Sequence, residues 1–268
     1  MVLEALLNPS YLVNSYLRLG IVGAFYALIA GFLAYLMFRP YASIVMVFFT
    51  IMVCIPFMYA LLKKEEEEDD RLVSEVNFID EYQHVTLGLV ALFLGVTAGY
   101  LVLYLVLPGP VHATLFSAQE STITAINGNM VTGGYFLEIF FNNLSVLGLS
   151  LALAFLYGFG AITIIVWNSS VLAAALGHFI TTKTLATNGL LAGFQGLFRY
   201  LLHGIPEIAA YLVAGLAGGI ISFAIINHHV GTKRWRKIVY DAGQLAVLSI
   251  LLLVIGALVE VFITPWFY

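Results

Sequence analysis

The chain has 268 residues, of which 62% are hydrophobic and 10% are charged, and its mean hydropathy is +0.99. This composition excludes an ordinary soluble domain and predicts that most of the chain lies in a lipid bilayer. The net charge of −4 is small and six of the 15 acidic residues lie in one run, so the sequence predicts no nucleic-acid partner. The single cysteine, Cys54, cannot form an internal disulfide, and we expect it to pack in an apolar core.

Residues 1–62 are predicted to form a transmembrane hairpin. Two apolar stretches, 16–38 and 41–62, are each about 20 residues long, which is enough to cross the hydrocarbon region of a membrane. Arg39 and Pro40 join them in a tight turn. The residues before Tyr16 contain neither a basic start nor a cleavage site typical of a signal peptide, so the first helix is expected to remain as an anchor.

Residues 63–84 are predicted to be an acidic loop on the cytoplasmic side. The run Glu65-Glu66-Glu67-Glu68-Asp69-Asp70 lies in this segment, and a solvated loop is its expected structure.

Residues 85–268 are predicted to form a larger membrane domain. The first span of this domain is 85–107. The stretch 134–180 contains one acidic residue and no Lys or Arg, and it is too long for one crossing but suits two, with a turn at Gly158-Phe159-Gly160. Two further spans are expected at about 205–226 and 245–263.

The orientation follows from the basic residues of the short loops. Lys63, Lys64 and Arg71 lie on one loop and the cluster from Lys233 to Lys237 on another, so both loops are expected to be cytoplasmic. The connection 108–133 has no Lys or Arg, which favours the opposite side. An odd number of crossings is then needed between these two sides. The prediction is an all-α, multi-pass helical bundle of the cell membrane with about seven transmembrane helices, its N-terminus inside and its C-terminus outside.

A six-helix alternative places a re-entrant pair between Ser169 and Tyr200. It would put four basic residues on the outer side, and the charge distribution disfavours it.

This topology brings the first turns of two spans together at the outer side. The fourth span opens with Glu138, Asn142 and Asn143, and the sixth is preceded by His203 and carries Glu207. Glu138 and Asn142 are one helical turn apart and share a face, whereas Asn143 lies about 100° further round. Pro206 is expected to be the first residue of the sixth helix, with His203 before it and Glu207 in its first turn.

Ionisable groups inside a membrane span require a partner or a function. One interpretation of the cluster is a set of hydrogen-bonded residues that ties two helices together. The other is a ligand site, in which His203, Glu207 and Glu138 are candidate ligands of a divalent metal with help from an Asn. No cofactor is predicted beyond this candidate metal. Asn168 in the fifth span is expected to bond to its own helix or to a neighbour, and Glu260 is expected to reach the interface and to need no partner.

With these polar residues in place, the sequence resembles the SpoIIM-like (stage II sporulation protein M, DUF95) family of integral membrane proteins. The resemblance covers roughly residues 75–263, so the hairpin before it looks like an addition. It is carried by Phe136-x5-Asn142-Asn143 at the start of a helix, by Gly158 and Gly160, by Asn168, and by His203-Gly204-x2-Glu207 followed by a Gly/Ala-rich helix. The sequence departs from the family pattern at Leu202, where proline is usual, and at Ser169, where glycine is usual.

The resemblance implies a role in assembly, because the namesake in spore-forming bacteria is similar to a factor that holds peptidoglycan-degrading partners at the septum. A non-enzymatic scaffold for a membrane complex is therefore the favoured function, although enzyme activity is left open. The expected partners are the lipid bilayer and membrane or envelope proteins, and a homo-oligomer is a further candidate. The alternatives are a transporter or lipid-handling protein, whose polar residues would line a cavity, and a metal-dependent intramembrane hydrolase with Glu207 as base.

Overall fold

The computed structural model describes residues 8–69, 82–131, 136–157, 160–181 and 190–263. Every regular element in these ranges is a helix, which confirms the all-α prediction. In chain order the elements are α2 (Pro9–Leu12), α3 (Tyr16–Met37), the 3-10 turn η1 (Arg39–Tyr41), α4 (Ala42–Asp69), α6 (Gln83–Val106), α7 (Gly109–Leu115), α8 (Ser117–Val131), α9 (Phe136–Tyr157), α10 (Gly160–Phe179), α12 (Leu190–Ile226) and α13 (Lys233–Phe262).

The long helices follow the predicted spans in order, but six rather than seven are long and apolar enough to cross a membrane. In addition, α9 contributes a shorter apolar stretch, Ile139–Phe155. The chain is therefore a polytopic membrane protein. One of the six stretches is Ile162–Phe179, which forms a single continuous helix through Ser169, where the six-helix alternative expected a re-entrant pair to begin.

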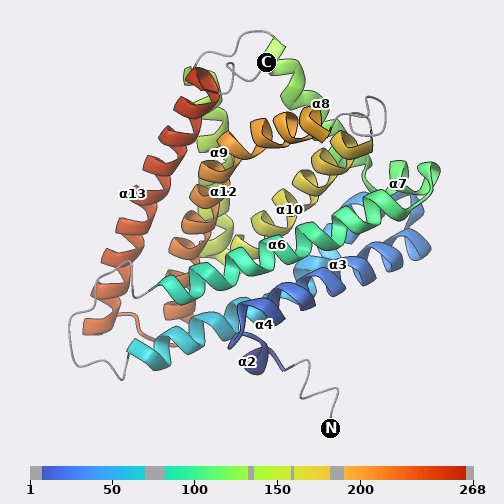
Figure 1. Ribbon diagram of the computed structural model, residues 1–268. Coiled ribbons are helices and arrows are strands. Elements are labelled where there is room, and N and C mark those ends of the chain that lie inside the picture. The colour runs from blue at the N-terminus through green and yellow to red at the C-terminus, as the bar shows by residue number, and fades with distance from the viewer. Residues whose placement is uncertain (1–7, 70–81, 132–135, 158–159, 182–189, 264–268) are drawn as a thin grey trace.

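Figure 1 shows two groups of helices. Helices α3, α4 and α6 run side by side, while α9, α12 and α13 contact one another in a second group, and α10 contacts both. We call the end of the bundle where α12 ends and α13 begins the inner end, because its Lys and Arg residues predict a cytoplasmic location. The opposite end is called the outer end.

The first long helix, α3, packs closely on α6. A Cβ atom added to Gly95 would collide with the backbone carbonyl of Gly20. Glycines at such positions let two helices approach until their backbones touch, which is a common way of joining helices in membranes.

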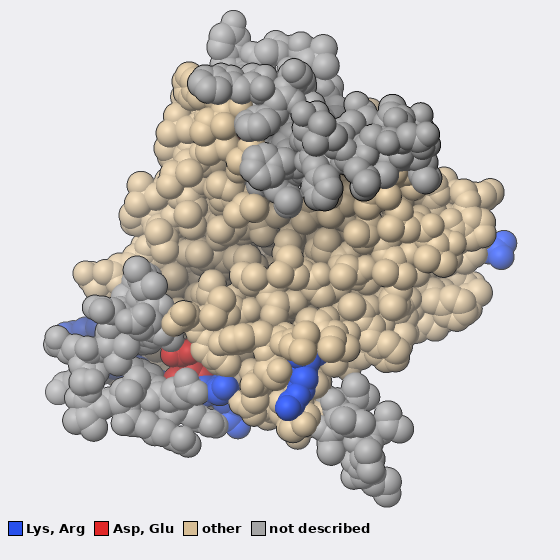
Figure 2. Space-filling view, in the orientation of Figure 1, with Lys and Arg blue, Asp and Glu red and all other residues tan. Residues whose placement is uncertain are grey.

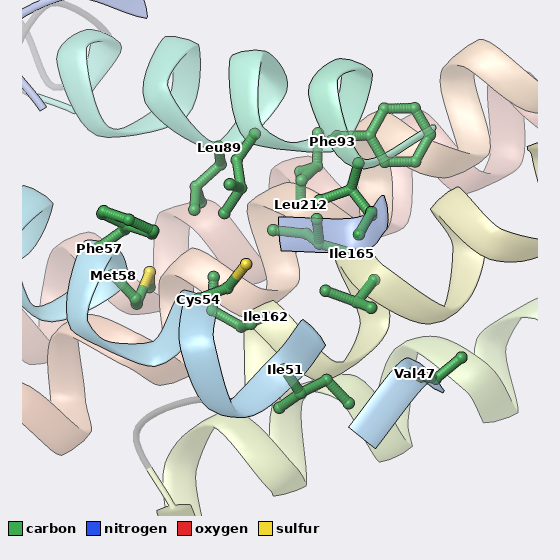
Figure 3. Packing of buried hydrophobic residues seen from close by; sticks show 14 of the residues in the cluster. Val47, Ile51, Cys54, Phe57, Met58, Leu89, Phe93, Ile162, Ile165 and Leu212 are labelled. Carbon is green, nitrogen blue, oxygen red and sulfur yellow. The ribbon is translucent and has the colours of Figure 1, made fainter. Parts of the chain in front are cut away.

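The main core lies where α4, α6, α10 and α12 meet. Its side chains interdigitate from all four helices, as seen for Phe57, Leu89, Ile162 and Leu212 in Figure 3. Cys54 is fully buried in this core, which confirms the packing role predicted for it.

Residues 63–69 differ from their prediction. Helix α4 continues to Asp69, so the first part of the acidic run is helical and the prediction of a loop from residue 63 was wrong there. Glu65 is buried, with 8% of its surface exposed. Glutamate is a good helix former, and the basic start of α13 lies beside this helix end, as described below. Residues 70–81 lie outside the described residues.

Helix α12 also differs from its prediction, because it begins at Leu190 rather than near residue 205. Pro206 therefore lies inside the helix, His203 belongs to it, and Glu207 is far from its first turn, so the predicted helix start was wrong. The residues before the proline are mostly apolar helix formers and extend the helix through it. An internal proline removes one backbone hydrogen bond and kinks the helix, and Figure 1 shows α12 changing direction along its length.

The predicted outer connection, residues 108–133, contains the helices α7 and α8. Gln119 of α8 is fully buried and bridges two spans. Its Oε1 accepts from Ser43 Oγ of α4 at 2.7 Å, and its Nε2 donates to Ser170 Oγ of α10 at 3.1 Å. This amide therefore joins three helices through a satisfied polar network.

Candidate functional site

The strongest candidate site lies in the outer half of the second group of helices. Asn143 of α9 donates its side-chain N–H to Oε1 of Glu207 in α12, with a donor–acceptor distance of 2.5 Å. Both residues are half-buried. The bond joins the first part of α9 to the segment of α12 that follows Pro206, so two of the sequence-predicted site residues do meet.

Helix α13 closes the site from the other side. A Cβ atom added to Gly256 would lie 3.0 Å from Cγ of Glu207, so the missing side chain makes room for the glutamate. One helical turn further along α13, Glu260 interacts electrostatically with Glu207. Tyr211, one turn after Glu207 on α12, is within electrostatic range of both carboxyl groups. We call Asn143, Glu207, Tyr211 and Glu260 the outer polar cluster.

Apolar residues close the site toward the inner end. Tyr211 belongs to a small buried cluster of side chains from α9, α10, α12 and α13, namely Leu147, Ile164, Ala210, Tyr211, Ala214 and Leu253. An apolar layer of this kind has a low dielectric constant, which strengthens the electrostatic interactions beside it.

The other sequence-predicted residues lie elsewhere. Asn142 is exposed, and its amide donates to Asn143 Oδ1 at 3.4 Å. Asn168 bonds within its own helix, with its amide 2.9 Å from the carbonyl oxygen of Ile164. The backbones of Glu138 and His203 lie in α9 and α12, but their side chains fall outside the described residues.

Two members of the outer polar cluster were missed by sequence reasoning. Glu260 interacts electrostatically with Glu207, although it was expected to need no partner, and Tyr211 was not singled out. A signal was present, because Gly256 and Glu260 are one turn apart on α13, as Glu207 and Tyr211 are on α12. A glycine and a carboxylate on one face indicate a close helix contact beside a polar group.

The chemistry of the cluster is that of oxygen donors. Two carboxylates, an amide and a phenol suit a proton or a hard cation better than a soft metal. Within the described residues, no group of three or more His, Cys, Asp and Glu is placed to hold a metal ion. The metal set of His203, Glu207 and Glu138 therefore remains a prediction.

A second buried polar cluster lies at the inner end, and sequence reasoning missed it. Asp241 of α13 is 5% exposed and accepts from the hydroxyl of Tyr82 at 3.4 Å. Together with Glu65 these residues line a cavity of about 50 Å³ into which basic side chains also project. We call Glu65, Tyr82, His229, Arg234, Lys237 and Asp241 the inner charged cluster. Figure 2 shows acidic and basic side chains together at this end.

Comparisons with known proteins agree with the membrane architecture. A family model described as "Stage II sporulation protein M" matches residues 45–265. The match begins earlier than the sequence-based estimate of residue 75 and includes most of α4. An uncharacterized protein of Methanocaldococcus jannaschii is 31% identical over 133 residues, which cover 48% of this chain and 71% of that protein. No solved structure matches the chain.

Proposed function

This chain belongs to the stage II sporulation protein M family, and on that basis we propose that it is a non-enzymatic scaffold for a membrane complex. The partner in this proposal is a membrane protein that presents an apolar transmembrane helix. The proposal rests mainly on one observation, which is the two-sided character of the outer half of α13.

One side of this segment is fixed to the bundle. Gly256 and Glu260 face α12, where Glu207 fills the space beside the glycine. The opposite side carries a ridge of exposed apolar residues, Ile255, Leu258 and Phe262, with 49%, 42% and 62% of their surfaces exposed. A spacing of three and four residues places them along one stripe of the helix. We call these three residues the α13 ridge.

The fraction of buried residues, compared between α12 and α13, supports the same proposal. In an apolar stretch of 18 residues within α13, 28% of the residues are buried within the chain, compared with 78% in the corresponding stretch of α12. A helix that is anchored on one face and open on the other can pack against a helix of another protein, since packing drives association in membranes. The outer polar cluster then has a structural role, because it holds α13 in the position that the partner recognises.

Site-directed crosslinking tests this proposal. Cys54 is the single cysteine of the chain, so Cys54→Ser provides a clean background for Leu258→Cys on the α13 ridge. We expect a crosslinked product in native membranes that disappears when Gly256 is replaced by leucine, because the larger side chain displaces α13 from Glu207. Leu149→Cys, on an exposed position of α9, is the matched control. Equal products from Leu258→Cys and Leu149→Cys, or a product that is insensitive to Gly256, would contradict the scaffold.

A second candidate function is transport of a proton or a small cation. It is favoured by the two carboxyl groups of Glu207 and Glu260, which repel each other when both are charged and which a bound cation or proton would relieve. The helix that carries Glu207 also contains Pro206, which frees one backbone carbonyl oxygen from its helical hydrogen bond beside the two carboxyl groups.

Flux into liposomes separates the two functions. A transporter predicts proton or Na⁺ uptake by the reconstituted protein that Glu207→Gln abolishes and Asn142→Ala leaves intact. Uptake at the level of empty liposomes would remove this candidate and leave the scaffold.

A further inference from the structure

The outer polar cluster brings two carboxyl groups together from different helices. Glu207 of α12 and Glu260 of α13 interact electrostatically, and both are half-buried. Within the described residues, the amide of Asn143 supplies the only hydrogen bond that these carboxyl groups accept. Two carboxylates in a membrane span repel each other strongly because the surroundings have a low dielectric constant. The pair therefore calls for a positive charge.

Tyr211 gives a second and independent indication of a ligand. It is 6% exposed, lies one helical turn from Glu207 on α12, and is within electrostatic range of both carboxyl groups. Within the described residues its hydroxyl forms no hydrogen bond. The buried Tyr100, by contrast, donates to Thr50 Oγ1 at 2.7 Å. Buried polar groups nearly always have a partner, so an unpaired hydroxyl beside two carboxyl groups indicates a site for a bound group.

The donor atoms and their charge indicate which ion suits the site. Carboxylate and hydroxyl oxygens favour hard cations. A divalent cation neutralises both carboxylates, whereas a monovalent cation leaves one buried charge uncompensated. Mg²⁺ demands near-ideal octahedral geometry and gives up its water reluctantly, while Ca²⁺ accepts oxygen ligands in flexible arrangements. Ligands that come from two separate helices therefore favour Ca²⁺.

We propose that the outer polar cluster binds one calcium ion between α12 and α13. Glu207 and Glu260 supply carboxylate oxygens and Tyr211 supplies its hydroxyl oxygen, while Asn143 orients Glu207 through the hydrogen bond. The proposal rests on the scaffold function, in which this cluster fixes α13, and it adds the ion that draws α13 toward α12. Calcium is here a bound structural ion and not a transported one.

Calcium binding to the full chain tests the site directly. The protein is solubilised in mild detergent, stripped with a chelator and measured by equilibrium dialysis against radioactive calcium. We expect one ion per chain with a Kd of about 0.1–1 mM, the range of extracellular calcium modules. Glu260→Gln should abolish binding, and Tyr211→Phe should weaken it about tenfold. Glu120→Gln is the matched control, because this carboxyl group accepts from Tyr104 instead and lies outside the cluster.

Thermal unfolding provides a readout that a purely structural cluster would not change. Without calcium, Glu260→Gln should be more stable than the unaltered protein, because the substitution removes the repulsion with Glu207. Saturating calcium should raise the melting temperature of the unaltered protein and leave that of Glu260→Gln unchanged. The order of the two stabilities should therefore narrow or reverse when calcium is added.

Several outcomes would overturn the proposal. Absence of calcium binding by the unaltered protein, or equal binding by Glu260→Gln, would remove the site. Equal affinity for Mg²⁺, or full displacement by an equal concentration of Na⁺, would contradict the choice of calcium. If Glu260→Gln does not fold, Tyr211→Phe decides, because it removes only an unpaired hydroxyl, and an unchanged affinity would contradict the site.

The crosslink through Leu258→Cys separates this proposal from the scaffold. Calcium binding without the crosslink would contradict the scaffold alone. The crosslink without calcium binding would contradict the calcium site alone.

Discussion

The two ends of the contact between α12 and α13 are both polar, but their charges are arranged differently. At the inner end the buried carboxylates of Glu65 and Asp241 share a small cavity with the basic residues Arg234 and Lys237. At the outer end Glu207 has another carboxyl group, Glu260, and a neutral amide, Asn143, as its described partners. Charge is therefore compensated at the inner end and, within the described cluster, uncompensated at the outer end.

This difference indicates that the inner charged cluster contributes to stability, whereas the outer polar cluster contributes to function. A compensated cluster at a helix junction resists any change to one of its members, because the loss of a partner leaves a buried charge behind. Like charges held together in a membrane span do not improve stability, so their placement calls for a functional reason. The outer polar cluster is held by the shape of the helices, through Gly256, and by one interhelical hydrogen bond.

The largest effect is expected at the inner end. Arg234→Met removes a basic group beside the buried Glu65 and Asp241, and it should lower the free energy of unfolding by about 3 kcal/mol. The neighbouring Arg236 is exposed and does not line the inner cavity, so Arg236→Met should change stability by less than about 0.5 kcal/mol. Unfolding of both variants in mild detergent measures the difference. Equal stabilities would show that the inner charged cluster does not hold the helices together.

A smaller effect is expected from the glycine of the outer site. Gly256→Ala places a methyl group against Glu207 and should destabilise the protein by about 1–3 kcal/mol through overpacking. Gly243 lies on the same helix in open space, and Gly243→Ala should instead stabilise the helix by about 0.5–1 kcal/mol. Thermal unfolding of the two variants should therefore shift in opposite directions. Shifts of the same sign would mean that the close contact at Gly256 does not exist.

The smallest effect is expected from the interhelical hydrogen bond. Asn143→Ala removes the bond to Glu207 and should cost about 0.6 kcal/mol, the average for such bonds in membranes. Asn142→Ala alters an exposed neighbour and should be close to neutral. Chemical unfolding of the pair checks this ranking, and a larger loss for Asn142→Ala would reverse the assignment of the two amides.

Hydropathy and charge predicted the membrane architecture, since each span needs about 20 apolar residues and loops with Lys and Arg face one side. The meeting of Asn143 and Glu207 was also within reach, because an even number of crossings separates the outer ends of the two predicted spans that carry them. The start of α12 could not be predicted from the sequence, because a proline such as Pro206 ends some helices and only kinks others. Which outcome occurs depends on packing that a single sequence does not show.

The residues that sequence reasoning missed in the two clusters were missed for a common reason. Glu65 and Asp241 are far apart in sequence, and Glu65 was interpreted only as part of its acidic run while Asp241 was not singled out. Their burial in one cavity depends on the inner ends of α4, α6, α12 and α13 meeting. Glu260 was missed for the same reason, because its proximity to Glu207 depends on the close approach at Gly256.

The central claim is that the outer polar cluster positions the α13 ridge for a partner. The most direct test is a double-mutant cycle of Asn143→Ala and Glu207→Ala, measured as the yield of the crosslink formed through Leu258→Cys in native membranes. Each single variant should lower the yield, and the double variant should lower it no further than Glu207→Ala alone, because both changes remove the same contact. Unchanged yields in both single variants would contradict the claim.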